Sequence, residues 1–308
     1  MNSAISTNNL VKRYGDVIAV DGLSLRVARG EIYAFLGLNG AGKTTTIRML
    51  LGMVKPTAGE ARVLGTGIRV GGAKPWDSVG YLVETADAYP ELSVRENLEA
   101  MRRLRPGVLP KAVDLAIERL GLVAYANRRA GTLSHGNAQR LGLAKALMHD
   151  PELLILDEPA NGLDPAGIVE IRNLLIELAH EQGVTVFMSS HILGEVARLA
   201  HRIGIIHGGR LLQELDIAEL ERNRRRRLLI QSRDMRAAHT VLCNAGFVPV
   251  SASNGVIEVK DTLAIERPDD IAKLLVNAGQ APTMLSVEQE DLEHYFLRLV
   301  GLEGEGES

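Results

Sequence analysis

Apolar and polar positions divide the chain into segments with different periods. Two continuous apolar runs, Ile32–Leu36 and Leu153–Leu156, have the length and composition of strands buried on both faces, as in the centre of a parallel sheet. Residues 9–27 alternate instead, with a turn signal at 14–16 and a second hairpin signal at Asp21-Gly22. The patterns predict an α/β protein with an antiparallel edge sheet.

The pattern becomes helical between residues 84 and 148. Ser93 and Glu96 have the spacing of a capping box that opens a helix at Val94, and Pro110 begins a second helix. A third helix follows Ser134 and has apolar residues three or four positions apart. We therefore expect an inserted helical lobe at about 85–148 within a main domain of residues 1–220.

Strand and helix signals alternate again in residues 221–308. Strands are predicted near 228–231, 247–250 and 256–260, and helices near 235–245, 269–278 and 292–301. The segment predicts a small α+β appendage with a disordered tail at 304–308. The arginine run at 224–227 is most simply a solvated linker between the domains; the alternative is attraction to anionic lipids.

Composition limits the class of protein. Of 308 residues, 46% are hydrophobic, and 35 basic residues face 38 acidic ones, so no global positive field favours nucleic acid as a partner. Cys243 is the only cysteine, which excludes an internal disulfide, and it is expected to be buried. The eight histidines lack the spacing of a zinc site. No apolar run approaches the ~18 residues of a membrane-spanning helix, so no direct membrane insertion is expected.

A phosphate cradle follows the first apolar run. Gly37, Gly42, Lys43 and Thr44 occupy the positions of the G-x-x-x-x-G-K-[ST] motif. Small residues there let backbone N–H groups converge on phosphate at a helix start, where Lys43 would reach the β- and γ-phosphates. The Thr44 hydroxyl is suited to Mg²⁺, which prefers oxygen ligands. The motif predicts a nucleoside triphosphate as ligand.

Two acids, Asp157 and Glu158, end the second apolar run. The carboxyl ends of parallel strands meet at the edge where α/β sheets bind ligands, and buried charges there need a cation or a polar partner. Asp157 is therefore predicted to hold Mg²⁺, and Glu158 to polarise the attacking water as general base. The alternative is an Asp-Glu pair on the surface.

Three further positions are candidates for contact with phosphate or with a helix end. Ser134 and the backbone N–H groups after it stand at a helix start, and they would close the γ-phosphate if the cradle belongs to another copy. His191 follows a predicted strand at 184–188, where its imidazole can donate to a γ-phosphate oxygen; alone, a histidine there is more often just a helix-start residue. Asp164 is predicted to cap the helix that starts at Pro165.

The order of these motifs resembles the nucleotide-binding subunits of ATP-binding-cassette transporters over residues 10–221. By this resemblance residues 37–45, including Asn39, Gly40 and Thr45, form the Walker A loop, and 153–158 form the Walker B strand. Residues 133–137, including Gly136, form the signature loop, 161–164 form the D-loop, and His191 is the switch histidine. Tyr14 is then the aromatic that stacks on adenine, although on sequence alone a surface tyrosine is equally expected.

The resemblance implies a P-loop NTPase fold with a mixed sheet, an antiparallel β subdomain and an inserted helical subdomain. It implies an ATPase subunit that forms a homodimer around two Mg-ATP and drives a separate integral membrane permease from the cytoplasmic face of the cell membrane. Two alternative functions would require different sequence features. A cytosolic ATPase of this family acting on nucleic acid or ribosomes would carry tandem cassettes, long coiled coils or a basic face, and a pure nucleotide sensor would lack Glu158.

This chain departs from the family pattern at three positions. The usual second glycine and the glutamine of the signature are His135 and Asn137, and the usual glutamine after the strand near 79–83 is Glu84. Glu84 and the following residues 89–98 resemble the subgroup that exports peptide antibiotics such as bacitracin and lantibiotics. We expect Glu84 near the γ-phosphate and Mg²⁺, where it would couple nucleotide state to the permease.

Overall fold

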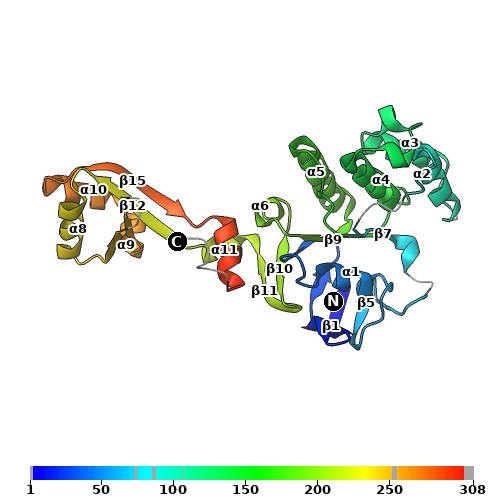
Figure 1. The fold of residues 1–308 in the computed structure, drawn as a ribbon, viewed down its shortest axis with the longest axis horizontal. Coiled ribbons are helices and arrows are strands. Elements are labelled where there is room, and N and C mark those ends of the chain that lie inside the picture. Colours follow the sequence, from blue (N-terminus) through cyan, green and yellow to red (C-terminus); the bar gives the residue numbers. More distant parts are fainter. Residues whose placement is uncertain (1–2, 73–74, 85–87, 106, 252–254, 302–308) are drawn as a thin grey trace. The chain divides into compact units, whose positions relative to one another are not determined.

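The computed structural model describes residues 3–72, 75–84, 88–105, 107–251 and 255–301. The chain divides into two units, Met1–Ile217 and Ala218–Ser308 (Figure 1). No helix in these described residues is long and apolar enough to cross a membrane. The predicted tail at 304–308 lies outside them.

A six-stranded mixed sheet forms the centre of the first unit. Five strands are parallel and the sixth, β11, forms an antiparallel hairpin with β10. The predicted apolar runs become β4 and β8, and every residue in both is buried. The strand order is β11 (Arg210–Asp216), β10 (Arg202–His207), β4 (Ile32–Leu36), β9 (Thr185–Ser190), β8 (Leu153–Leu156) and β7 (Val79–Leu82).

A second, antiparallel sheet holds the N-terminal strands. The predicted turn at 14–16 joins its first two strands, but the predicted hairpin at Asp21-Gly22 is wrong. Gly22 has a positive φ, yet β2 continues through it because Leu23 still pairs with Leu10. The strands are β1 (Ser3–Tyr14), β2 (Val17–Leu23), β3 (Arg26–Ala28), β5 (Ala58–Val63) and β6 (Thr66–Gly67).

Helix α1 (Lys43–Leu50) packs with both sheets. Its Ile47, Met49 and Leu50 join one buried cluster with Phe35 and Phe187 of the mixed sheet and with strands of the antiparallel sheet. Helices α4 (His135–Leu147) and α5 (Pro165–Gln182) lie on the other side of the mixed sheet (Figure 1). The sheet is thus covered on both faces, as its continuous apolar strands require.

The helical lobe contains α2 (Val94–Arg103) and α3 (Lys111–Arg119), which pack on each other and on α4. The predicted capping box at Ser93 and Glu96 is confirmed, because each side chain bonds to the backbone N–H of the other. Pro110 is the residue directly before α3, as its fixed φ favours.

The second unit begins within α7 (Ile217–Asn223) and continues in the order strand, helix, two strands, two helices, strand, helix. Leu228 and Ile230 of β12 pack with Ala238, Leu242 and Leu275 in its core. The sheet order is β13 (Pro249–Ser251), β14 (Ile257–Val259), β12 (Arg226–Ser232) and β15 (Pro282–Gln289). The helices are α8 (Met235–Asn244), α9 (Thr262–Glu266), α10 (Pro268–Asn277) and α11 (Leu292–Leu299).

Two predictions for this unit are wrong. Arg226 and Arg227 do not form a linker but begin β12, where Arg227 pairs with Glu258 and Glu288 at 2.7 Å. Acidic partners on neighbouring strands thus replace the self-repulsion that predicted a solvated segment. Cys243 is exposed rather than buried.

Candidate active site

The phosphate loop joins β4 to α1 and depends on two glycines. Gly42 has φ 105°, and a Cβ placed on it would lie 2.4 Å from the Ala19 carbonyl oxygen. A Cβ on Gly37 would lie 2.6 Å from the Ile206 carbonyl oxygen. No other residue fits at either position without moving the backbone. The loop lines a cavity of about 220 Å³ together with Ala19 and Glu158.

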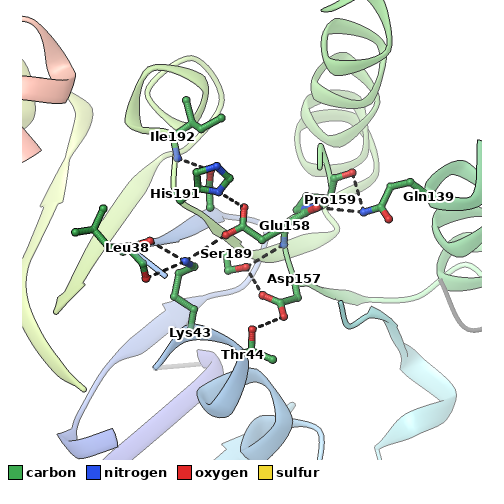
Figure 2. A network of polar contacts seen from close by, with 12 residues as sticks. Leu38, Lys43, Thr44, Gln139, Asp157, Glu158, Pro159, Ser189, His191 and Ile192 are labelled. Atoms are coloured by element: carbon green, nitrogen blue, oxygen red, sulfur yellow. Dashed lines mark hydrogen bonds and ion pairs between the residues drawn. The ribbon is translucent and has the colours of Figure 1, made fainter. Parts of the chain in front are cut away.

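Lys43 brings a buried positive charge to this cavity. Figure 2 shows its contacts. Its side chain is only 6% exposed. The Nζ donates to the carbonyl oxygens of Gly37 at 2.7 Å and Leu38 at 3.3 Å, and lies 3.2 Å from the Glu158 carboxylate. A buried ammonium in a loop of converging N–H groups fits a polyanionic phosphate chain.

Asp157 lies between two hydroxyl groups. The Thr44 hydroxyl donates to one carboxylate oxygen at 2.7 Å and the Ser189 hydroxyl to the other at 2.5 Å. Asp157 is buried directly after β8, so these bonds satisfy a charge that water does not reach. A carboxylate beside a threonine hydroxyl supplies the hard oxygen ligands that Mg²⁺ prefers, so the pair fits this ion.

Glu158 connects Lys43 with His191 (Figure 2). One carboxylate oxygen lies 3.2 Å from the Lys43 Nζ, and the other lies 2.8 Å from the His191 Nδ1. An ionised carboxylate only accepts hydrogen bonds, so Nδ1 carries the proton in this contact. The structure thus brings Lys43, Thr44, Asp157, Glu158 and His191 together, as the sequence predicted from separate segments.

A further acid, Glu195 of α6 (Leu193–Val196), stands beside this group. Burial raises the pKa of the Glu195 carboxyl, while the charge of His191 lowers it and that of Glu158 raises it. Glu195 was not predicted as a site residue, because no sequence motif covers this short helix.

Ser134, Gly136 and Asp164 lie at helix starts. The Ser134 hydroxyl accepts from the Asn137 N–H at 3.3 Å and caps α4, and the Asp164 carboxylate accepts from the Gly167 N–H at 2.9 Å and caps α5. The predicted cap at Asp164 is confirmed. None of the three lines the described cavity around the phosphate loop.

Glu84 and Tyr14 also lie apart from the cavity lining. Glu84 is exposed, and its carboxylate pairs with the guanidinium of Arg48 in α1 at 2.8 Å. The expected place of Glu84 next to Mg²⁺ is therefore not seen, since its cationic partner is an arginine away from Thr44 and Asp157. Tyr14 is exposed at the end of β1, and the Lys12 Nζ lies 4.6 Å from its ring centroid. The stacking of Tyr14 on adenine stays a prediction.

Gln139 of α4 was also not predicted from the sequence. This side chain is only 2% exposed, and its Nε2 donates to the carbonyl oxygens of Glu158 at 3.1 Å and Pro159 at 3.3 Å (Figure 2). The available signal was its place four residues before Leu143, on the face of α4 that is buried. A buried amide at such a position needs hydrogen-bond partners, and the carbonyls of Glu158 and Pro159 after β8 supply them.

Comparisons with known proteins agree with this geometry. The family model described as ABC transporter matches residues 20–161. The bacitracin transport ATP-binding protein BcrA of Enterococcus faecalis is 39% identical over 98% of this chain and 97% of its own length. BcrA of Bacillus licheniformis is 40% identical over 98% of both chains. The dimeric structure of MJ0796, a bacterial ABC transporter cassette, matches with a TM-score of 0.65 and 26% identity, covering 69% of this chain and 98% of that one. The predicted fold class is confirmed.

Proposed function

Because the chain belongs to the ATP-binding subunits of ABC transporters, we propose that this ATPase forms a homodimer around two Mg-ATP and drives a separate membrane permease. The observation that carries the proposal is the carboxylate of Glu158, which lies between Lys43 and His191 beside the Thr44–Asp157 pair. A nucleotide sensor without hydrolysis has no use for this arrangement.

In this proposal each polar side chain has one task at the γ-phosphate. Lys43 binds the β- and γ-phosphate oxygens. The phosphates then compete with Glu158 for the ammonium group of Lys43, so the Glu158 carboxylate becomes available to accept a proton from water. His191 donates to Glu158 through Nδ1, and donation to phosphate through Nε2 requires the imidazolium form. When bound, Mg²⁺ neutralises phosphate charge, and the Thr44 hydroxyl and Asp157 carboxylate would hold it.

The second copy supplies the remaining contacts. Ser134 and Gly136 lie at the start of α4, outside the lining of this chain's own cavity, where N–H groups and the helix dipole favour an anion. In a homodimer they would close the γ-phosphate of the partner. The dimeric state of the MJ0796 cassette supports this arrangement.

The permease would dock on the helical lobe. A mostly apolar pocket of about 690 Å³ lies between α2 and residues 88–92, lined by Tyr89, Met101 and Leu104 among others. Leu104 is 75% exposed there. An apolar helix of a permease fits such a surface, which would hold the chain at the cytoplasmic face of the cell membrane. The BcrA relatives favour peptide antibiotics such as bacitracin as the transported substrate.

We expect Leu104→Asp to weaken binding to the permease about tenfold or more, because an exposed apolar contact worth about 2 kcal/mol is replaced by a charge. ATP hydrolysis by the chain alone should not change. Leu115→Asp is the matched control, since this leucine of α3 is 57% exposed and does not line the pocket. Titration of the detergent-solubilised permease with labelled chain measures both, and equal affinities for the two variants would contradict this docking site.

Reconstitution of the chain and its permease into liposomes tests the function as a whole. The proposal expects ATP-dependent movement of bacitracin across the membrane, with no movement when ATP is replaced by a non-hydrolysable analogue. ATP hydrolysis that is stimulated by RNA or ribosomes, with no transport, would favour the cytosolic rival instead.

In the same liposomes we expect Glu84→Ala to lower transport per ATP hydrolysed about fivefold or more, a typical size for coupling between two sites. Its affinity for ATP should fall less, because Glu84 pairs with Arg48 outside the phosphate loop. Glu84→Gln should keep part of the coupling, since it preserves the shape and one acceptor. If Glu84→Ala transports as much per ATP hydrolysed as the parent, Glu84 has no role in coupling and is only a solvated acidic residue of the loop.

A further inference from the structure

We propose that Gln139 is a positioning residue for Glu158 and that, through it, the start of α4 controls the catalytic carboxylate of the same chain. The amide Nε2 of Gln139 donates to the Glu158 carbonyl at 3.1 Å and to the Pro159 carbonyl at 3.3 Å (Figure 2). This inference rests on the proposed role of Glu158 as the base that activates water.

The backbone of Glu158 needs external support. Its φ is +50°, in the left-handed region that residues with a Cβ rarely adopt. Such a conformation persists only where the surroundings determine it from several sides. The Ser189 hydroxyl accepts from the Glu158 N–H at 2.9 Å. The Glu158 carbonyl accepts from the Gln139 Nε2 and, within the same turn, from the Asn161 N–H at 3.0 Å, so both ends of the residue are held. Without Gln139 the Glu158 carbonyl keeps the local bond from Asn161 but loses its tie to α4, so the turn can shift and move the carboxylate from its position between Lys43 and His191.

The start of α4 contacts the same segment a second time. The His135 ring lies against Gly162, where an added Cβ would be 1.7 Å from the His135 Cδ2. A Cβ on Gly136 would lie 3.2 Å from the Gly162 carbonyl oxygen. Residues 135–139 and 158–162 therefore pack as one body, and Ser134 stands directly before it. Binding of a second copy's ATP at Ser134 is thereby transmitted to Glu158 of this chain.

A purely structural role predicts a different result. If Gln139 only satisfies two buried carbonyls, its loss lowers the melting temperature and leaves the chemical step of the folded protein unchanged. If it positions Glu158, its loss lowers kcat, leaves KM for ATP unchanged, and has no effect once the Glu158 carboxylate is gone. Two measurements therefore distinguish the roles: the separate changes in kcat and KM of the Gln139 variants, and the kcat of a variant that also carries Glu158→Gln.

The experiment measures single-turnover and steady-state ATP hydrolysis by the full chain. Gln139→Met keeps the side-chain length and removes the donor, and Gln139→Leu also removes the donor with a different side-chain shape, so that a folding defect of one variant does not remove the test. Gln182→Met is the matched control, because this glutamine of α5 is exposed and bonds only weakly, at 3.5 Å, to Glu177. Melting temperatures and ATP affinities are measured for each.

We expect kcat to fall about 10- to 100-fold in both Gln139 variants, as for a misplacement of about 1 Å at a reacting group, with KM within about twofold. Gln182→Met should equal the parent. In the Glu158→Gln background, adding Gln139→Met should cause no further fall. A kcat of Gln139→Met within twofold of the parent, or an equal fold-loss in both backgrounds, overturns the inference. A Glu158→Gln variant that retains parental hydrolysis would instead overturn the base assignment itself.

Discussion

Glu158→Gln should lower the rate of ATP hydrolysis at least 100-fold while the affinity for ATP stays within about threefold of the parent. General-base catalysis by a positioned carboxylate contributes about 10²- to 10⁴-fold, and an amide does not accept the proton of water. Lys43 and Thr44, which would bind the phosphates and Mg²⁺, are untouched by the change. Single-turnover hydrolysis and equilibrium binding of labelled ATP measure the two effects.

The matched control for this prediction is Glu177→Gln. Glu177 is an exposed residue of α5 that pairs with Arg119 at 2.9 Å, away from the phosphate loop. Its hydrolysis rate should equal that of the parent. Turnover of Glu158→Gln near the parental rate would show that another group activates the water.

Lys43→Ala should weaken ATP binding itself, by about 10- to 100-fold. The change removes a buried cation whose charge-assisted bonds to phosphate are each worth about 1.5–3 kcal/mol. It also removes the Lys43 donor from the Gly37 carbonyl and from one oxygen of Glu158, while the Leu38 carbonyl keeps its bond from the Ala41 N–H. Equilibrium binding of labelled ATP is the measurement.

Lys111→Ala provides the comparison for this second variant, since Lys111 is an exposed lysine at the start of α3. Its ATP affinity should not change. If Lys43→Ala binds ATP as tightly as Lys111→Ala does, the assignment of the phosphate loop is wrong.

The parts of the fold that the sequence predicted are those with a strong local signal. The apolar runs at 32–36 and 153–156 have the length and composition of buried strands, and the capping box at Ser93 predicts a helix start from four residues. The glycines of the phosphate loop are required by backbone contacts within that loop and the chain next to it. Local chemistry therefore suffices to predict Lys43, Thr44, Asp157 and Glu158 as site residues, and the structure places their side chains next to one another.

Features that depend on distant parts of the chain were not predictable in this way. Strand β15 was missed because its residues are at most half-buried and because it pairs with β12, which lies 50 residues or more before it in the chain. Glu84 pairs with Arg48, and Gln139 with the carbonyl of Glu158, across separate elements. No spacing in the sequence indicates such partners. Arg227 likewise finds its acids on two other strands.

The central claim is that two copies of this chain close around two ATP molecules, and sedimentation of the Glu158→Gln variant tests it most directly. Slow hydrolysis should trap the closed state, so we predict a dimer holding two ATP in the presence of Mg-ATP and a monomer in its absence. Lys43→Ala should remain a monomer under the same conditions. A Glu158→Gln chain that binds ATP yet stays monomeric at every protein concentration measured would contradict the claim.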